Sequence, residues 1–204
     1  MTIAFNPTTE AKAPQITARP GIAAGTLMLT QTGMRPVEQL AVGDKLITRD
    51  RGLQPLRWIG QSTATPLSVH FAAGAMGDHG AVVLAPTTRV LIRNALAKAL
   101  FGESEVFAFA ADLVNGETIT TQADTAPRQI LHLLFDRHEI LRASELEVES
   151  LHPDRAMMRQ LDAETQASIL SLLPNTDALM GYGYGPTARI CLRKSEARMF
   201  SPCC

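Results

Sequence analysis

Short runs of apolar, strand-forming residues separated by turn residues dominate the first three quarters of the chain. Val, Ile, Leu, Thr and Phe are common in the runs, and Gly, Pro, Asn or Asp stands between them, which is typical of strands joined by tight turns. Turns roughly every 8 to 12 residues indicate an all-β sandwich or barrel. The predicted strands are residues 26–31, 45–48, 54–59, 67–71, 81–84, 105–109, 117–121, 130–135 and 139–141.

Helical spacing is confined to a few segments, and it becomes prominent after residue 152. There Asp162 is predicted to be an N-cap, and an apolar stripe runs from Ile169 to Leu173, just before Pro174. The predicted helical or mixed segments are 94–101, which Gly102 ends, 110–114, 153–173 and 188–200, the last of them a basic strand or helix.

Composition divides the chain into three parts. Residues 1–20 hold three prolines with several Thr and Ala and no apolar periodicity, so a flexible N-terminal tail is predicted. Residues 21–152 carry the predicted strands and form a mostly β domain. Residues 153–204 form a helical and basic C-terminal extension, in which the glycine-rich stretch 175–186 is predicted to be a loop. A second glycine-rich loop, 74–80, lacks the strand-to-helix context of a phosphate cradle.

Charge and hydropathy exclude several classes of protein. The chain has 204 residues, 46% of them hydrophobic, and a net charge of -1, so it can form a packed core and does not carry the basic excess of a nucleic-acid or polybasic membrane-surface protein. No apolar run approaches the roughly 18 to 20 residues that span a bilayer. The first twenty residues lack the basic and apolar regions of a secretory signal. We therefore expect a cytoplasmic protein, or one exported without a Sec signal, with no nucleic-acid or membrane partner.

The cysteines form no disulfide framework and no zinc motif. Cys191 is predicted to be a small buried hydrophobe. Cys203 and Cys204 are predicted to lie at an exposed end, because adjacent cysteines rarely form a relaxed disulfide with each other.

The histidines do not form a metal site either. His132, Asp136 and His138 would share one face of a strand, but three ligands from one strand splay too far for a tight tetrahedral site. His70 and His79 flank the first glycine-rich loop and are expected to be exposed to solvent. No metal and no cofactor are predicted.

One ordered series of motifs resembles Hint domains, the autoprocessing modules shared by Hedgehog proteins and inteins. The pattern G-T … G … P-V-E-x-L-x-x-G-D-x-[hydrophobic]-x-T runs from Gly25 to Thr48 and is similar to the opening block of that family, and of a bacterial subfamily in particular. The resemblance implies a β-rich, horseshoe-like disc over residues 21–152. Later matches follow in order at 50–60, 89–93, 100–103, 132–140 and 149–151, with a looser match at 189–198.

The resemblance also implies a chemistry that this chain has lost. Active Hint domains begin with a Cys or Ser that attacks the preceding carbonyl, and a [T/S]-x-x-H block assists the attack. The position that matches the nucleophile is Gly21, and Ala85 and Thr88 stand where the Thr or Ser and the His belong. His138 is the retained histidine of a later block, with Asp136 nearby. It is either a remnant general acid or base, or a histidine hydrogen-bonded at a strand end.

Three hypotheses about function follow. In the first, the chain is a degenerate Hint module, unable to cleave itself and retained for binding or assembly with another protein or with its own N-terminal tail. Its recognition surface would be the old cleft or the loop at Tyr182–Tyr184. In the second, the domain still cleaves the Pro20–Gly21 bond through a relocated nucleophile, with His138 as the base. The candidates for that nucleophile are Thr26, Thr87 and Thr88. In the third, residues 1–20 dock as an uncleaved pseudo-substrate, which predicts an ordered tail leading into a buried Gly21.

Overall fold

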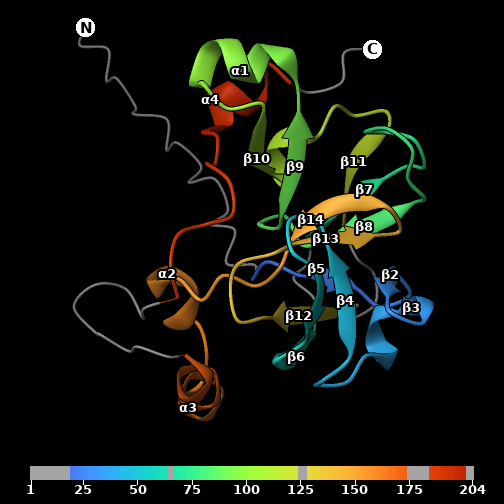
Figure 1. Ribbon diagram of the computed structural model, residues 1–204. Coiled ribbons are helices and arrows are strands. Elements are labelled where there is room, and N and C mark those ends of the chain that lie inside the picture. The colour runs from blue at the N-terminus through green and yellow to red at the C-terminus, as the bar shows by residue number, and fades with distance from the viewer. Residues whose placement is uncertain (1–18, 64–66, 124–127, 174–183, 201–204) are drawn as a thin grey trace, which may run out of the picture.

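The described residues form two antiparallel sheets that pack on each other (Figure 1). The structure is a computed structural model, and it describes residues 19–63, 67–123, 128–173 and 184–200. Predictions for residues 1–18, for Tyr182 and for the two terminal cysteines lie outside these residues.

The first sheet is six-stranded and places the shortest strand at its centre. Its order is β11 (Ile119–Ala123), β7 (Leu67–Phe71), β8 (Val82–Leu84), β1 (Ile22–Ala23), β12 (Gln129–Leu134) and β6 (Trp58–Thr63).

The second sheet is eight-stranded, and β10 forms one of its edges. Its order is β10 (Glu105–Phe109), β9 (Arg89–Arg93), β14 (Leu146–Glu149), β13 (Ile140–Ala143), β2 (Leu27–Thr30), β4 (Lys45–Thr48) and β5 (Gly52–Pro55), with β3 (Gly33–Pro36) paired to β2.

Most predicted strands are present, and the mostly β fold class is confirmed. Predicted strand 54–59 is in fact two strands, the end of β5 and the start of β6, with Leu56 and Arg57 between them. β11 begins and ends two residues later than predicted. The strands that the hydrophobic pattern did not identify are β1, β3, β9 and β14.

Local signals place the helices. α1 (Ala95–Phe101) begins after Asn94, whose side chain accepts a hydrogen bond from Leu96 N, and ends at Gly102 in the left-handed conformation. The predicted helix at 153–173 is broken into α2 (Arg155–Met158) and α3 (Ala163–Leu172). Asp162 caps α3 as predicted. The remaining short helices are η1 (Val37–Gln39), η2 (Ala110–Leu113) and α4 (Lys194–Ala197).

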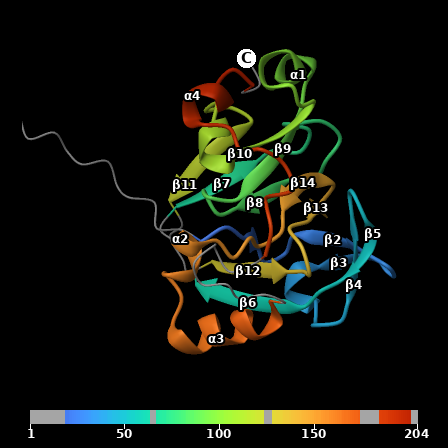
Figure 2. The same ribbon diagram turned by 60° about the vertical axis from the view of Figure 1, so that its left-hand side comes forward.

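Two apolar cores hold these elements together. The main core is largely aliphatic and lies between the sheets. A second core joins the extension to the first sheet, where Ile169 of α3 packs with Leu134 of β12 and Trp58 of β6. Figure 2 shows α3 lying along β6 and β12. None of the described helices is long and apolar enough to cross a membrane.

Three sequence predictions about burial are wrong. His79 is buried, because its Nδ1 donates to Gly80 O at 2.6 Å and its Nε2 accepts from Met76 N at 3.0 Å within the glycine-rich loop. Cys191 is exposed rather than buried. Tyr184, predicted to lie on a recognition loop, is buried in the second core and donates its hydroxyl to Phe135 O at 3.0 Å.

Candidate functional site

Strand β1 brings residues 20 and 21 into the middle of the first sheet. Ile22 pairs with Leu131 on one side and with Leu84 on the other. The peptide bond between Pro20 and Gly21 therefore lies next to β12 and to the turn that follows β8, and Gly21 is buried there.

The three positions that resemble the family's reactive residues meet at the backbone of Gly21. Gly21 N donates to Thr88 Oγ1 at 2.8 Å, and the Thr88 hydroxyl donates to Gly21 O at 2.9 Å. Ala85 N also donates to Gly21 O, at 3.0 Å. A turn positions Thr88, since its own N–H donates to Ala85 O at 3.0 Å. Gly21, Ala85 and Thr88 thus form one hydrogen-bonded cluster that contains no thiol and no imidazole.

Gly21 has no room for a side chain. A Cβ built there would lie 2.5 Å from Ile130 Cγ2, 2.8 Å from His132 Nδ1 and 2.8 Å from Leu131 O. Contacts this short cannot persist without movement of the neighbours. The Gly21 backbone is outside the left-handed region, so space, rather than backbone conformation, demands glycine here.

His132 holds the carbonyl on the other side of this bond. Its Nδ1 lies 2.7 Å from Pro20 O, and since a carbonyl oxygen only accepts, Nδ1 carries the proton. Its Nε2 then accepts from Ser62 Oγ at 2.9 Å. Burial lowers the pKa of His132 from 6.5 to about 4, so the ring is neutral at pH 7. From the sequence alone His132 was considered only as a metal ligand, because its role here depends on the pairing of β12 with β1.

His138 lies in a second buried cluster. Its Nδ1 accepts from Ala188 N at 2.9 Å, and its Nε2 donates to Glu149 Oε2 and Ser150 O, both at 3.1 Å. The ring also packs edge-on against His152, with 5.0 Å between ring centroids. Both nitrogens of His138 are thus engaged within this cluster.

Glu149 lies between the two clusters, and no role was predicted for it from the sequence. Its carboxylate accepts from Arg89 N and Arg89 Nη1, both at 2.7 Å, as well as from His138. Glu149 also lines a cavity of about 10 Å³ together with Pro20, Gly21 and His132. That volume corresponds to about one water molecule.

Asp136 lies in a different environment. It forms a two-armed ion pair with Arg57, at 2.9 and 2.8 Å, and both side chains are about half exposed. The expectation that His132, Asp136 and His138 share one strand face is wrong, because β12 ends at Leu134. Within the described ranges, no group of three His, Cys, Asp or Glu side chains is arranged to hold a metal ion.

The chain leading into the site is held by the C-terminal extension. Arg19 Nη2 donates to Gln160 O at 2.6 Å, just after α2. A cavity of about 120 Å³ lies beside Arg19, between His132 of β12 and Asp162 at the start of α3. Arg19 and Pro20 are partly buried here and lead into a buried Gly21. The part of the pseudo-substrate hypothesis that concerns residues 1–18 lies outside the described residues.

Comparisons with known proteins agree with the motif analysis. The family described as "Hint domain" matches residues 20–155. Among solved structures, the bacterial intein-like domain from Clostridium thermocellum is 16% identical, with a TM-score of 0.49, 66% of this chain covered and 99% of that one. The AceL NrdHF class 3 split intein, a splice-inactive variant, is 10% identical, with a TM-score of 0.48, 65% of this chain covered and 98% of that one. The comparison with curated proteins found no match.

Proposed function

This chain belongs to the Hint domain family, and we propose that it is a member that does not cleave itself and now serves as a binding or assembly module. The acyl shift of the family needs a nucleophilic side chain at the position of Gly21. This chain has none there.

The space around Gly21 carries the proposal. A Cβ on Gly21 would lie only 2.5 Å from Ile130 Cγ2 and 2.8 Å from His132 Nδ1. Side chains of β12 therefore occupy the space that a nucleophilic side chain at position 21 would need. The loss of the nucleophile thus involves the neighbours of Gly21 as well as Gly21 itself. Thr88 also supports the proposal, because its hydroxyl is engaged with the backbone of Gly21: it accepts from Gly21 N and donates to Gly21 O.

What remains at the junction supports a holding role. The His132 N–H on Pro20 O and the Thr88 hydroxyl on Gly21 satisfy the polar groups of a buried peptide bond. Polarising a carbonyl accelerates acyl transfer only when a nucleophile attacks it. Without one, the same hydrogen bonds fix the junction in the sheet and direct the preceding chain past α2.

Cleavage through Thr88 is the second candidate function, favoured by its two hydrogen bonds to Gly21. As a nucleophile Thr88 would need a base for its proton. His138 does not meet that need, since Ala188 N occupies Nδ1 and Nε2 donates to Glu149 and Ser150.

Intact mass separates the two candidates. The full chain, fused to a removable N-terminal tag, is incubated for a day with and without a thiol and hydroxylamine, alongside Thr88→Val and His138→Ala variants. We expect a single uncleaved mass in every sample. A fragment beginning at or near Gly21, present in the unmodified chain and absent from Thr88→Val, would establish cleavage and overturn the proposal.

A further inference from the structure

Residues 189–192 lie along the edge of β10, and Tyr184 and Ala188 before them contact Phe135 and His138. Phe107 N donates to Ile190 O at 2.8 Å, and Leu192 N donates to Phe107 O at 2.7 Å, so Phe107 and Cys191 form a parallel β-bridge. β10 is the terminal strand of the eight-stranded sheet. The segment therefore supplies a partner to backbone groups that a sheet edge leaves open.

The same segment inserts one cation between two carboxylates. The Arg189 guanidinium donates to Asp50 at 2.7 and 2.9 Å and to Glu105 at 2.6 and 2.9 Å. One residue earlier, Ala188 N donates to His138 Nδ1 at 2.9 Å. Backbone and side-chain hydrogen bonds of this segment therefore fix its register against β10 together.

Apolar burial contributes little to this contact. None of residues 185–191 is buried, and Ile190 is 46% exposed. The buried residues Tyr184 and Leu192 flank the stretch on either side. A segment held by hydrogen bonds and partly exposed ion pairs opens locally more easily than the core.

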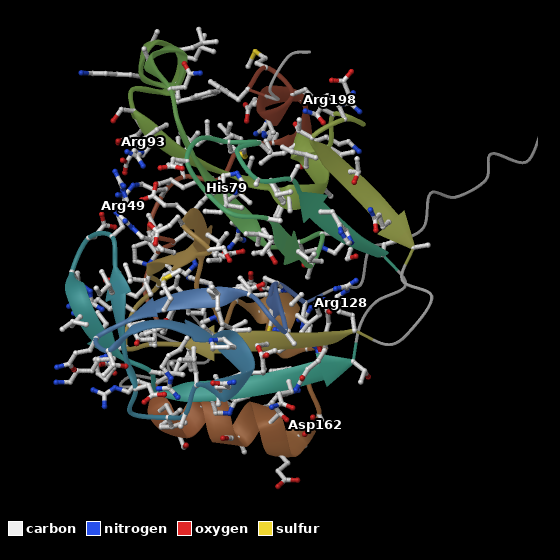
Figure 3. All side chains as sticks on the ribbon, turned by 90° about the vertical axis from the view of Figure 1, so that its right-hand side faces the viewer. Arg49, His79, Arg93, Arg128, Asp162 and Arg198 are labelled. Atoms are coloured by element: carbon white, nitrogen blue, oxygen red, sulfur yellow. The ribbon has the colours of Figure 1, made fainter. Side chains whose placement is uncertain are left out.

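An open surface continues from the two carboxylates. A cavity of about 370 Å³ lies beside Arg189 and is lined by Thr48, Arg49, Asp50, Glu105 and Arg142. Figure 3 shows Arg49 and Arg93 on the same side of the molecule, where both also pair with Glu147. The Asp50 carboxylate accepts hydrogen bonds from Arg189, whereas Glu105 also pairs with Arg49.

We propose that this edge of β10 is a peptide-binding groove for an extended segment of a partner protein that carries an arginine, and that residues 185–191 fill it in the resting chain. The partner's arginine lies between Asp50 and Glu105. The backbone N–H of the partner residue before that arginine donates to His138 Nδ1, and the backbone of the partner segment pairs with Phe107. Adding a strand to an open sheet edge is a recurring mode of peptide recognition. The inference rests on the proposed binding role and names its partner class.

The test displaces residues 185–191 from the groove by reversing the charge of residue 189. In the full-length Arg189→Glu chain, Asp50 and Glu105 repel the segment's own side chain. The probe is a fluorescent peptide with the sequence of residues 185–192 and Ser in place of Cys191, measured by anisotropy. Because a tethered segment competes at a high effective concentration, we expect binding to Arg189→Glu at least about tenfold tighter than to the unmodified chain.

Two changes examine the arginine pocket itself. A peptide with Glu in place of its arginine should not bind, and Asp50→Asn in the Arg189→Glu chain should weaken binding of the arginine peptide. Asp136→Asn in the same background is the matched control, because Asp136 pairs with Arg57 outside the groove. It should leave binding unchanged.

The fold of each variant is checked by circular dichroism and thermal unfolding. A folded Arg189→Glu chain that binds neither peptide, or binds both equally, overturns the proposal. A mixed dimer of unmodified and Arg189→Glu chains, found by light scattering, would identify a second copy as the source of the segment. The intact-mass experiment reports on Pro20–Gly21 separately, so either result stands if the other fails.

Discussion

His132 Nδ1 lies 2.7 Å from the carbonyl oxygen of Pro20, across 112 residues of sequence. The same nitrogen lies 2.8 Å from the place where a Cβ on Gly21 would be. One ring therefore holds the carbonyl of the junction and occupies the space of the missing side chain. Gly21 and His132 are two parts of one packing arrangement, so a change at one affects the packing of the other.

Replacing Gly21 should destabilise the fold. Gly21→Ala puts a methyl group against Ile130 Cγ2 and Leu131 O, and forcing an extra carbon into a packed site costs about 1–3 kcal/mol. Urea unfolding measures the loss. Adding Ile130→Ala removes one of the close contacts. In a double-mutant cycle, the double variant should therefore lose less stability than the sum of the losses of the two single variants. A Gly21→Ala chain as stable as the unmodified one would contradict the packing argument.

The stability of the chain should fall between pH 6.5 and pH 4 because of His132. Burial lowers its folded-state pKa to about 4 from 6.5, so in this window the unfolded chain binds a proton that the folded chain does not. Stability from this group is full above pH 6.5 and is lost as pH falls toward 4, a change of about 3 kcal/mol. The measurement is urea unfolding at several pH values.

His132→Gln provides the comparison for that pH dependence. The variant should be less stable at pH 7 and should lose less stability on acidification. Burial lowers the pKa of His152 as well, which contributes in the same direction in both chains. The difference between the two profiles therefore isolates His132, and parallel profiles would rule out the assignment.

The sequence predicted the fold where local signals are strong. Asp162 caps α3 as expected, since its side chain satisfies a free N–H group at the helix start, and Gly102 ends α1 as expected. Strand β1 was missed because two residues carry no periodicity, and only pairing with Leu131 and Leu84 defines it. Strand β14 was missed because Ser144 and Glu145, in the turn that joins it to β13, adopt positive φ where Asn or Gly is the usual signal.

The candidate site was predictable only in part. The motifs identified Gly21, Ala85 and Thr88, and these positions do meet at the backbone of Gly21. Glu149 and His132 were missed, because their roles come from tertiary contacts with Arg89 and Pro20 that no spacing encodes. A polar residue on a strand has no sequence signal for what lies opposite it.

Thr88 should matter through its hydroxyl. Thr88→Val keeps the shape but leaves Gly21 N without its acceptor in a buried site, and an unsatisfied buried donor costs about 1–3 kcal/mol. Thr88→Ser keeps the hydroxyl and should retain most of the stability. Chemical denaturation of the three chains under the same conditions checks the order, and equal losses for Val and Ser would point to packing of the methyl group instead.

Replacing Glu149 should destabilise the fold far more than replacing Asp136. It accepts from Arg89 and His138 and is 3% exposed. Glu149→Gln leaves the largely buried Arg89 guanidinium without its nearest counter-charge, and breaking a buried pair on one side costs about 3–5 kcal/mol. Asp136→Asn removes an equally well-formed pair with Arg57 at the surface, where solvent screens the charges, so no measurable change is expected. Thermal and urea unfolding of both variants decide the point: if Glu149→Gln unfolds like Asp136→Asn, the buried Glu149–Arg89 pair does not stabilise the fold in the way argued.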